Sequence, residues 1–166
     1  LTLQGIPQST QADFAKLRPY DLIIVHYGLN VAVSGNPKNI IQNYARNMGK
    51  VVAHLRQAFP ETSILVFSVP DHEQRGADGI KTLKEVHALV AFQQQMAADK
   101  KVGFYNFFQA MGGEGATRRL VERDMANKDY THLSYGGGKY VADKIYPSFK
   151  AGLKNYQRRI KLESQW

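Results

Sequence analysis

Hydrophobic residues along the chain alternate between short continuous runs and longer stretches with helical spacing. Continuous aliphatic runs of strand length occur at 21–28, 63–70 and 102–107. The first two runs are each followed by a stretch in which apolar residues recur every three or four positions, at 37–59 and 82–99. Apolar strands separated by amphipathic helices are typical of a parallel sheet covered on both faces. The pattern therefore predicts an α/β fold.

Both ends of the chain extend this prediction. A short strand around 1–6 and a helix at 11–17 would add one step at the N-terminus. Near the C-terminus we expect a short helix at 116–123 and a last helix from about 135 to 153. The segment between 71 and 79 is polar and is predicted to be a loop.

Composition narrows the class of protein. The chain has 166 residues, of which 43% are hydrophobic and 22% charged, values ordinary for one soluble domain. No apolar run approaches the roughly 18 residues that a membrane span needs. The absence of cysteine excludes disulfides and thiolate metal sites. The first ten residues lack the basic start and apolar stretch of a secretion signal.

The net charge of +8 is unevenly distributed. Two groups of basic residues stand out: Arg118, Arg119 and Arg123 in one, and Lys150, Lys154, Arg158, Arg159 and Lys161 in the other. We expect a domain over 1–153 and a basic tail over 154–166. A solvated helical face explains such charge, and no motif with interleaved aromatic residues predicts a nucleic-acid partner.

Candidate chemistry follows the first clear strand at Tyr27, Gly28 and Asn30. Ligands of open α/β sheets gather at the carboxyl ends of the strands. A glycine allows close approach of a substrate, and an Asn amide can donate to a carbonyl oxygen that becomes negative. An ordinary turn would explain the same Gly and Asn.

A second candidate lies just before the last predicted helix, at Asp129 and His132. In a loop at this spacing the carboxylate can accept a proton from one ring nitrogen, which leaves the other nitrogen free to act as a base. The alternative is a helix-capping aspartate beside an ordinary histidine, and Ser134 could itself be the cap.

A third polar loop, at Asp71, His72, Glu73 and Arg75, matches no common metal-ligand spacing. We expect it to be solvated, with Asp71 and Arg75, together with Tyr27, contacting substrate. The remaining histidines, His26, His54 and His87, are expected to be packed or on the surface.

Together, the aliphatic strand ending in Gly-Leu-Asn and the late Asp-Tyr-Thr-His resemble two signature blocks of the SGNH/GDSL hydrolases. The resemblance extends over about 5–153 and is strongest to a bacterial cell-envelope branch of peptidoglycan or polysaccharide O-acetylesterases. It implies a flavodoxin-like three-layer α/β/α fold. It also implies that Asn30 is the oxyanion donor, His132 the base and Asp129 its orienting acid, without metal or organic cofactor.

The chain departs from this family in two places. None of its serines stands in a Gly-Asp-Ser or Gly-x-Ser-x-Gly context, so no nucleophile is assigned. These serines are Ser9, Ser34, Ser63, Ser68, Ser134, Ser148 and Ser164. In Gly5-Ile6-Pro7-Gln8, Gln8 occupies the position of a family glycine that helps to hold the oxyanion. The backbone N–H of Gln8 would then donate beside that of Gly28.

The missing block has a structural consequence. In the family, the serine-bearing strand lies between the strand near Leu1 and the strand near Asp21. Unpaired edges beside a gap in the middle of a sheet are destabilising. We therefore expect the 166 residues to need an upstream segment or another chain that carries the serine, and to be inactive alone.

The resemblance predicts hydrolysis of carboxyl esters, in particular O-acetyl esters on a glycan or cell-envelope polymer, in the periplasm or at the bacterial cell surface. The alternative is a catalytically inactive SGNH-like domain that binds glycans or an envelope protein.

Overall fold

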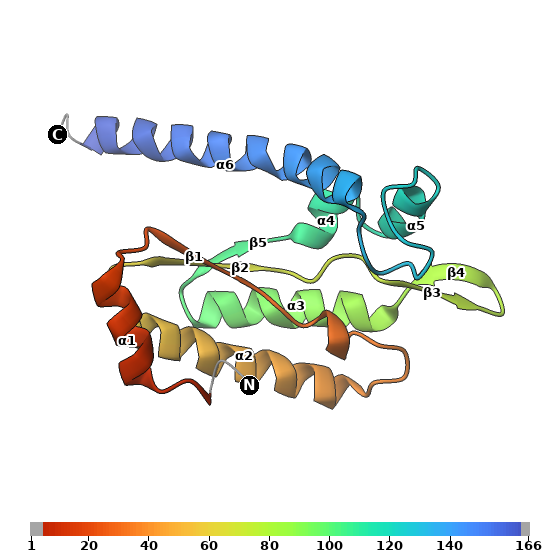
Figure 1. Ribbon diagram of the computed structural model, residues 1–166, viewed down its shortest axis with the longest axis horizontal. Helices are drawn as coiled ribbons and strands as arrows, with labels where there is room; N and C mark the ends of the chain where they lie inside the picture. The colour runs from red at the N-terminus through yellow and green to blue at the C-terminus, as the bar shows by residue number, and fades with distance from the viewer. Residues whose placement is uncertain (1–4, 164–166) are drawn as a thin grey trace.

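The sheet is parallel and has the strand order β1-β2-β5. The computed structural model describes residues 5–163, in which β1 spans Leu22–His26, β2 Ser63–Phe67 and β5 Gly103–Tyr105. Helices cover the sheet in two layers, one on each side (Figure 1). The predicted α/β fold with a parallel sheet is confirmed.

One helical layer consists of α1 (Gln8–Leu17), α2 (Lys38–Ala58) and α3 (Lys84–Asp99). In α2 the buried positions form a single stripe, made by Ile41, Ala45, Met48, Val52 and Leu55. Their spacing of three and four residues places them on one side of the helix. Met48, Val52 and Leu55 of this stripe pack with Val25, Ile64 and Val66 of the sheet and with Met96 of α3 in one core cluster.

The other layer consists of α4 (Phe107–Met111), α5 (Ala116–Val121) and α6 (Tyr135–Glu163). Phe67 of β2, Phe107 of α4 and Val141 of α6 meet in a second core cluster. The last helix runs ten residues beyond its predicted end at 153, because no glycine or proline interrupts it after Gly152. The basic residues of 154–163 therefore lie on α6 itself.

Two short elements differ from the prediction. The polar segment after β2 contains an antiparallel hairpin, β3 (Glu73–Gly76) paired with β4 (Gly79–Thr82). Its strands are too short and polar for hydrophobic periodicity to identify them. The strand predicted over 102–107 ends at Tyr105, because the Asn106 side chain accepts a hydrogen bond from the Gln109 N–H and caps α4.

The outer edge of β1 has no partner strand in the described part of the chain. Leu22 and Ile24 on this strand are 41% and 48% exposed, although they belong to the aliphatic stretch Leu22–Val25. The strand expected around 1–6 falls mostly outside the described residues, and Gly5 and Ile6 form no strand. No helix within 5–163 is long and apolar enough to cross a membrane.

One buried side chain joins the ends of β1 and β2. Gln93 of α3 has no exposed surface. Its Nε2 donates to the carbonyl oxygen of Tyr27 at 2.9 Å, and its Oε1 accepts from the Val69 N–H at 3.0 Å. Both backbone groups lie just beyond their strands, where the sheet ladder no longer satisfies them.

Gln93→Ala should lower the free energy of unfolding by about 2–4 kcal/mol, because two buried backbone groups lose their partner and a cavity opens. Gln95→Ala is the matched control: Gln95 is exposed, donates to Asp99 on its own helix, and should change stability by less than about 0.5 kcal/mol. Urea unfolding measures both variants. Equal stabilities would contradict the role given to Gln93.

Candidate active site

The loop after β1 turns sharply at Gly28. This residue has φ of 118°, and a Cβ there would lie 2.9 Å from Tyr44 Cε1 and 3.1 Å from Leu89 Cδ2. Only glycine combines that backbone conformation with such close neighbours. A single 3-10 turn, η2 (Leu29–Val31), follows it and leaves Asn30 exposed. No hydrogen bond occupies the Asn30 amide within residues 5–163, so it is available to a ligand.

Asp129 folds its own loop around His132. Oδ1 of Asp129 accepts from the N–H groups of Thr131 and His132, both at 3.0 Å. This local hydrogen bonding is typical of an aspartate in a turn. It directs Oδ2 towards Nδ1 of the His132 ring, at 2.8 Å. The pair predicted from the Asp-Tyr-Thr-His sequence therefore forms in the structure.

The imidazole of His132 is held on one side only. Nδ1 faces Asp129, and Nε2 has no hydrogen-bond partner in the described part of the chain. The His132 and Asp129 side chains are 70% and 48% exposed. The His132 N–H, followed by the His132 ring, lowers the pKa of Asp129 to about 2. At neutral pH the pair thus combines a carboxylate with an imidazole whose second nitrogen faces solvent.

Two consecutive residues after β2 connect this loop to the loop after β1. Nδ1 of His72 lies 3.0 Å from the carbonyl oxygen of Ala32. The N–H of Glu73 donates to the carbonyl oxygen of Tyr130 at 3.2 Å. The Gly28–Ala32 and Asp129–His132 loops are therefore brought to the same edge of the sheet. Their connection through His72 and Glu73 was missed by the sequence analysis, because the contacts join segments 40 or more residues apart.

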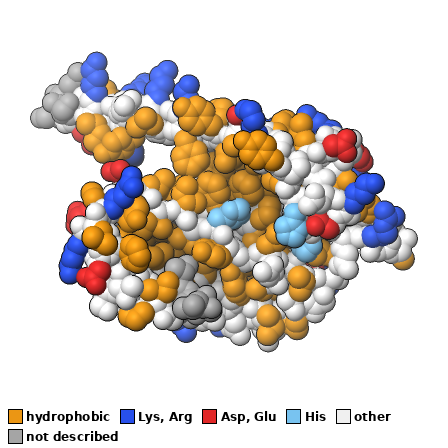
Figure 2. All heavy atoms as spheres, viewed as in Figure 1, with side chains coloured by type: hydrophobic (Ala, Val, Ile, Leu, Met, Phe, Trp, Pro, Cys, Tyr) orange, Lys and Arg blue, Asp and Glu red, His pale blue; other side chains and the backbone are white. Residues whose placement is uncertain are grey.

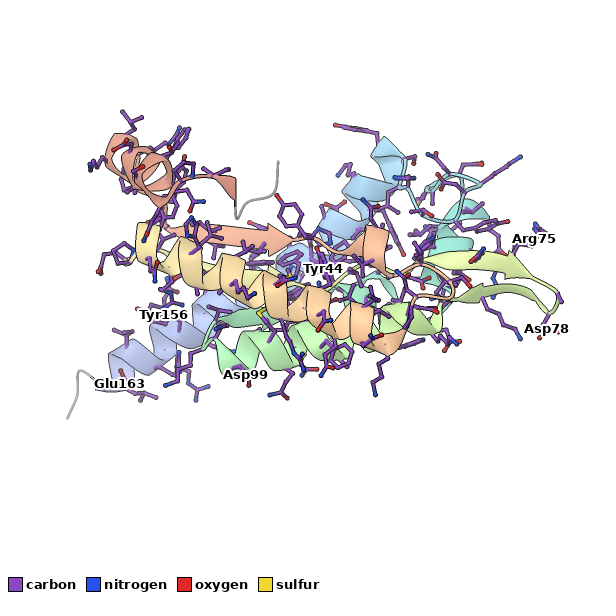
Figure 3. All side chains as sticks on the ribbon, turned by 90° about the horizontal axis from the view of Figure 1, so that it is seen from below. Tyr44, Arg75, Asp78, Asp99, Tyr156 and Glu163 are labelled. Carbon is purple, nitrogen blue, oxygen red and sulfur yellow. The ribbon has the colours of Figure 1, made fainter. Side chains whose placement is uncertain are left out.

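A hollow of about 360 Å³ lies between the Asp129–His132 loop, the hairpin, and Val33 and Ser34 just after the Gly28–Ala32 loop. Its lining includes Ser34, His72, Arg75, Asp129 and Tyr130. Arg75 is also close to the outer end of the hairpin, where Asp78 lies (Figure 3). Tyr27, 55% exposed at the end of β1, does not line this hollow. Because Arg75 lines the hollow, it remains a candidate for contact with a substrate. Tyr27 lies outside the hollow, at the end of β1, and its predicted contact with a substrate stays a prediction.

Asp71 does not contact solvent, contrary to its prediction as a substrate-binding residue. Its side chain is fully buried. Oδ1 accepts from Thr82 Oγ1 at 2.7 Å, and Oδ2 accepts from the Thr117 N–H at 2.8 Å. Because both oxygens are occupied, Asp71 holds β4 and α5 together. Sequence proximity to the strand end could not reveal partners 11 and 46 residues away.

Gln8 also lies away from the two loops. Its side chain donates to Oε1 of Gln57 at 3.0 Å. Gln57 is 13 residues along α2 from Tyr44, the neighbour of Gly28, which corresponds to about 20 Å at the rise of an α-helix. The structure thus does not bring the Gln8 N–H to Gly28, and the expectation of a shared oxyanion site is corrected here.

The other three histidines pack against aromatic rings or bond the backbone, and we assign them no catalytic role. His26 packs against Phe107 with ring centroids 4.9 Å apart, and burial lowers its pKa. His54 bonds the Ile6 carbonyl oxygen, and His87 packs edge-on against Phe108. Within residues 5–163, no group of three or more His, Asp and Glu side chains is arranged to hold a metal ion.

The fold and the paired loops define a class: α/β proteins with a parallel sheet whose carboxyl edge carries an Asp–His pair. Comparison with family models finds no match, and comparison with curated protein sequences finds none either. Solved structures do match. The chain is similar to a structure of a peptidoglycan O-acetylesterase, with a TM-score of 0.76 and 23% identity over 89% of the chain. It is also similar to the periplasmic domain of a lipopolysaccharide acetyltransferase from Salmonella ser. Paratyphi A, with a TM-score of 0.55 and 9% identity over 85% of the chain.

At these identities the likeness shows a shared fold. The chain spans 41% of the O-acetylesterase chain and 61% of the acetyltransferase domain. Both solved structures thus contain substantial polypeptide beyond the part that resembles this chain.

We expect the carboxyl group of Asp129 to titrate at about pH 2, because the hydrogen bonds from His132 stabilise its ionised form. A folded-state pKa below the unfolded value of about 4 means that the pair stabilises the fold above that pH and loses this contribution as the pH falls through 2. Carbon-13 NMR of the carboxyl group measures the midpoint. His132→Ala removes the ring hydrogen bond but keeps the backbone one, so the midpoint should rise only part of the way towards 3.8; an unchanged midpoint would refute the contribution of the ring.

Gly137 allows the backbone of Met125, four residues before the Asp129–His132 loop, to lie against α6. A Cβ at Gly137 would overlap the carbonyl oxygen of Met125, which accepts a hydrogen bond from the Ser134 N–H. Gly137→Ala should therefore destabilise the protein by about 2 kcal/mol or more and shift the His132 NMR signals. Gly138 has open space around its missing Cβ, so Gly138→Ala should raise stability by about 0.5–1 kcal/mol. Urea unfolding distinguishes the two, and equal effects would contradict the packing.

Proposed function

We propose that this chain is part of a serine esterase that hydrolyses O-acetyl esters on a glycan or cell-envelope polymer, and that the serine comes from outside the 166 residues. The observation that carries the proposal is the Asp129–His132 pair at the carboxyl edge of the sheet. Within residues 5–163, Nε2 of His132 has no hydrogen-bond partner. The fold shared with a peptidoglycan O-acetylesterase supports it. A periplasmic or cell-surface location belongs to the same proposal and is supported by the likeness to a periplasmic domain.

The chemistry assigns one step to each group. Nε2 of His132 takes the proton from the serine Oγ, which attacks the carbonyl carbon of the ester. Asp129 holds the ring through Nδ1 and stabilises the positive charge that the ring acquires. The Asn30 amide and the Gly28 N–H donate to the oxyanion of the tetrahedral intermediate.

The intermediate then collapses. The bond to the sugar oxygen breaks, and His132 returns its proton to that oxygen, which leaves as a hydroxyl group. A water molecule, deprotonated by His132, attacks the acetyl-serine in the same way. Acetate departs and the serine recovers its proton. Every step uses side chains and water, so the proposal requires no metal or organic cofactor.

The position of the serine is indicated by the unpaired edge of β1. A parallel strand added there would end beside Gly28, because its carboxyl end would align with that of β1. The exposure of the Asp129 and His132 side chains also supports a further segment that covers them. Ester hydrolysis by a serine and a histidine works best where bulk water is largely excluded. A catalytically inactive binding domain is the second candidate, favoured by the absence of a Gly-Asp-Ser block from the chain.

The test uses the polypeptide extended upstream of Leu1 through the nearest Gly-Asp-Ser block, with p-nitrophenyl acetate and an O-acetylated glycan as substrates. The 166-residue chain alone should show no turnover. In the extended protein, His132→Ala should lower kcat about 10³-fold or more, and Asn30→Ala about 10²–10³-fold. His87→Ala, an exposed histidine on α3, is the control and should leave kcat unchanged. Full activity in His132→Ala, or no Gly-Asp-Ser block upstream, would refute the proposal.

A further inference from the structure

A second hollow, of about 370 Å³, lies between α5 and the start of α6. This α5–α6 hollow shares no lining residue with the hollow beside Asp129. Three basic residues line it: Arg119 on α5, Arg123 just after α5, and Lys144 on α6. Among the described residues, Glu122 is the one acidic residue of the lining. The hollow therefore has an excess of positive charge.

The ring of Tyr140 holds two of these cations close to each other. Cζ of Arg123 lies 4.6 Å from the ring centroid, and Nζ of Lys144 lies 4.8 Å from it. The two charges are therefore no more than about 10 Å apart, which is the screening length at 0.1 M salt, and they repel each other. Hydrogen bonding to Lys144, and then to Arg123, lowers the pKa of the Tyr140 hydroxyl, as expected of two neighbouring cations.

The third cation, Arg119, is fixed by the backbone. Its Nη1 donates to the carbonyl oxygen of Glu114 at 3.0 Å, and its Nη2 donates to the carbonyl oxygen of Gly112 at 2.8 Å. A guanidinium group has more N–H donors than these two bonds use. Because the group is already held in place, binding a ligand through its other donors costs little further side-chain entropy.

The described residues provide no counter-charge for this cluster. None of the three cations forms an ion pair with a carboxylate within residues 5–163. Asp143, the neighbour of Lys144 in sequence, is bound to Lys139 at 3.1 Å instead. A surface hollow lined by one sign of charge concentrates ions of the opposite sign. The α5–α6 hollow is therefore suited to bind an anionic group.

The α5–α6 hollow adjoins the segment that carries the candidate catalytic pair. Arg123 directly precedes the loop over 124–134, which contains Asp129 and His132. α6 begins at Tyr135, just after this loop, and rises about 14 Å from there to Lys144. An extended polymer that presents an ester to His132 can therefore also reach the hollow.

α6 continues the positive charge beyond the hollow. Lys150, Lys154 and Arg158 follow one another at intervals of four residues, and none of them forms an ion pair in the described part of the chain. Figure 2 shows Lys and Arg side chains along the border of the molecule that α6 forms. Such an extended arrangement favours a polymer with repeated negative groups over a single small anion.

We propose that the α5–α6 hollow binds a carboxylate or phosphate group of an anionic polysaccharide through Arg119, Arg123 and Lys144, and so holds the polymer beside the Asp129–His132 pair. This inference rests on the proposed function, which it deepens by naming the charge of the substrate. Guanidinium groups bind carboxylate and phosphate oxygens through paired hydrogen bonds, and an ammonium group adds a point charge.

The aromatic ring in the lining favours a polysaccharide over a nucleic acid. Proteins that bind single-stranded nucleic acid stack its bases on aromatic side chains. Tyr140 packs against the core cluster, and Arg123 and Lys144 contact its ring. The ring is thus already occupied by protein groups, which leaves charge as the means of recognition.

The test uses the full polypeptide that contains this chain, and titration calorimetry in about 0.1 M salt measures its Kd for three probes. The probes are an oligogalacturonate, a phosphorylated dextran oligosaccharide and the same oligosaccharide without phosphate. At least one charged probe should bind, with a Kd that rises with salt, and the neutral probe should not bind. The two charged probes distinguish a carboxylate from a phosphate as the recognised group.

Arg123→Gln combined with Lys144→Gln should raise this Kd at least about tenfold, because the charge-assisted hydrogen bonds to the anion are lost. Arg46→Gln combined with Lys50→Gln is the matched control. It removes the same charge from two exposed side chains that line a different hollow, between α2 and α3. The control should change Kd less than about twofold, because salt screens distant charges.

Carbon-13 NMR of Tyr140 locates the bound anion. A negative charge beside the phenol disfavours its ionised form, so binding should raise the pKa of Tyr140 towards its ordinary value. An anion bound elsewhere on the protein would leave this pKa unchanged, and that result would contradict the proposed place of binding.

The other outcomes separate the binding site from the chemistry. Equal effects of the two double variants, or failure of both charged probes to bind, would overturn the anion site. Tighter binding of single-stranded oligo(dT) or of anionic phospholipid vesicles than of either charged probe would also overturn it, because the partner would then be of another class. Binding of a charged probe without esterase activity would refute the proposed function and leave the anion site intact.

Discussion

The unpaired edge of β1 is the constraint on which the rest of this structure depends. Within residues 5–163, β1 is an edge strand: one edge is bonded to β2 and the other is open, with Leu22 and Ile24 half exposed on one face. Open apolar edges invite pairing with another strand, and stable proteins cover or charge them. The Gly28 loop lies at the carboxyl end of this edge, so a strand added beside β1 would end next to that loop.

The candidate site is built from backbone contacts more than from contacts between side chains. Gln93 holds the ends of β1 and β2, and His72 and Glu73 bind the two functional loops to each other. The two groups to which we assign chemistry, the Asn30 amide and Nε2 of His132, have no hydrogen-bond partner within residues 5–163. This arrangement allows a rigid framework to position side chains whose binding capacity is kept for a ligand.

The likeness to an O-acetylesterase and to an acetyltransferase domain concerns the framework, which is the fold, and not the side chains of the site. One of these proteins is an O-acetylesterase and the other an acetyltransferase, and both extend well beyond the region that resembles this chain. A shared fold at low sequence identity does not establish which reaction a protein catalyses, because one fold can support different chemistry. The Asp129–His132 pair is what makes ester hydrolysis the function best supported for this chain.

Sequence alone determined the α/β class, the three strands, the main helices and the Asp129–His132 pair. These depend on local periodicity and on a loop of four residues whose hydrogen bonds are internal. Tertiary structure decided the rest. Asp71 became a buried connector and Gln8 a partner of Gln57, since both contacts join residues remote along the chain. Hydrophobic periodicity also could not distinguish Leu22 and Ile24 from core residues, because it records that a strand needs covering on both faces and not which segment covers it.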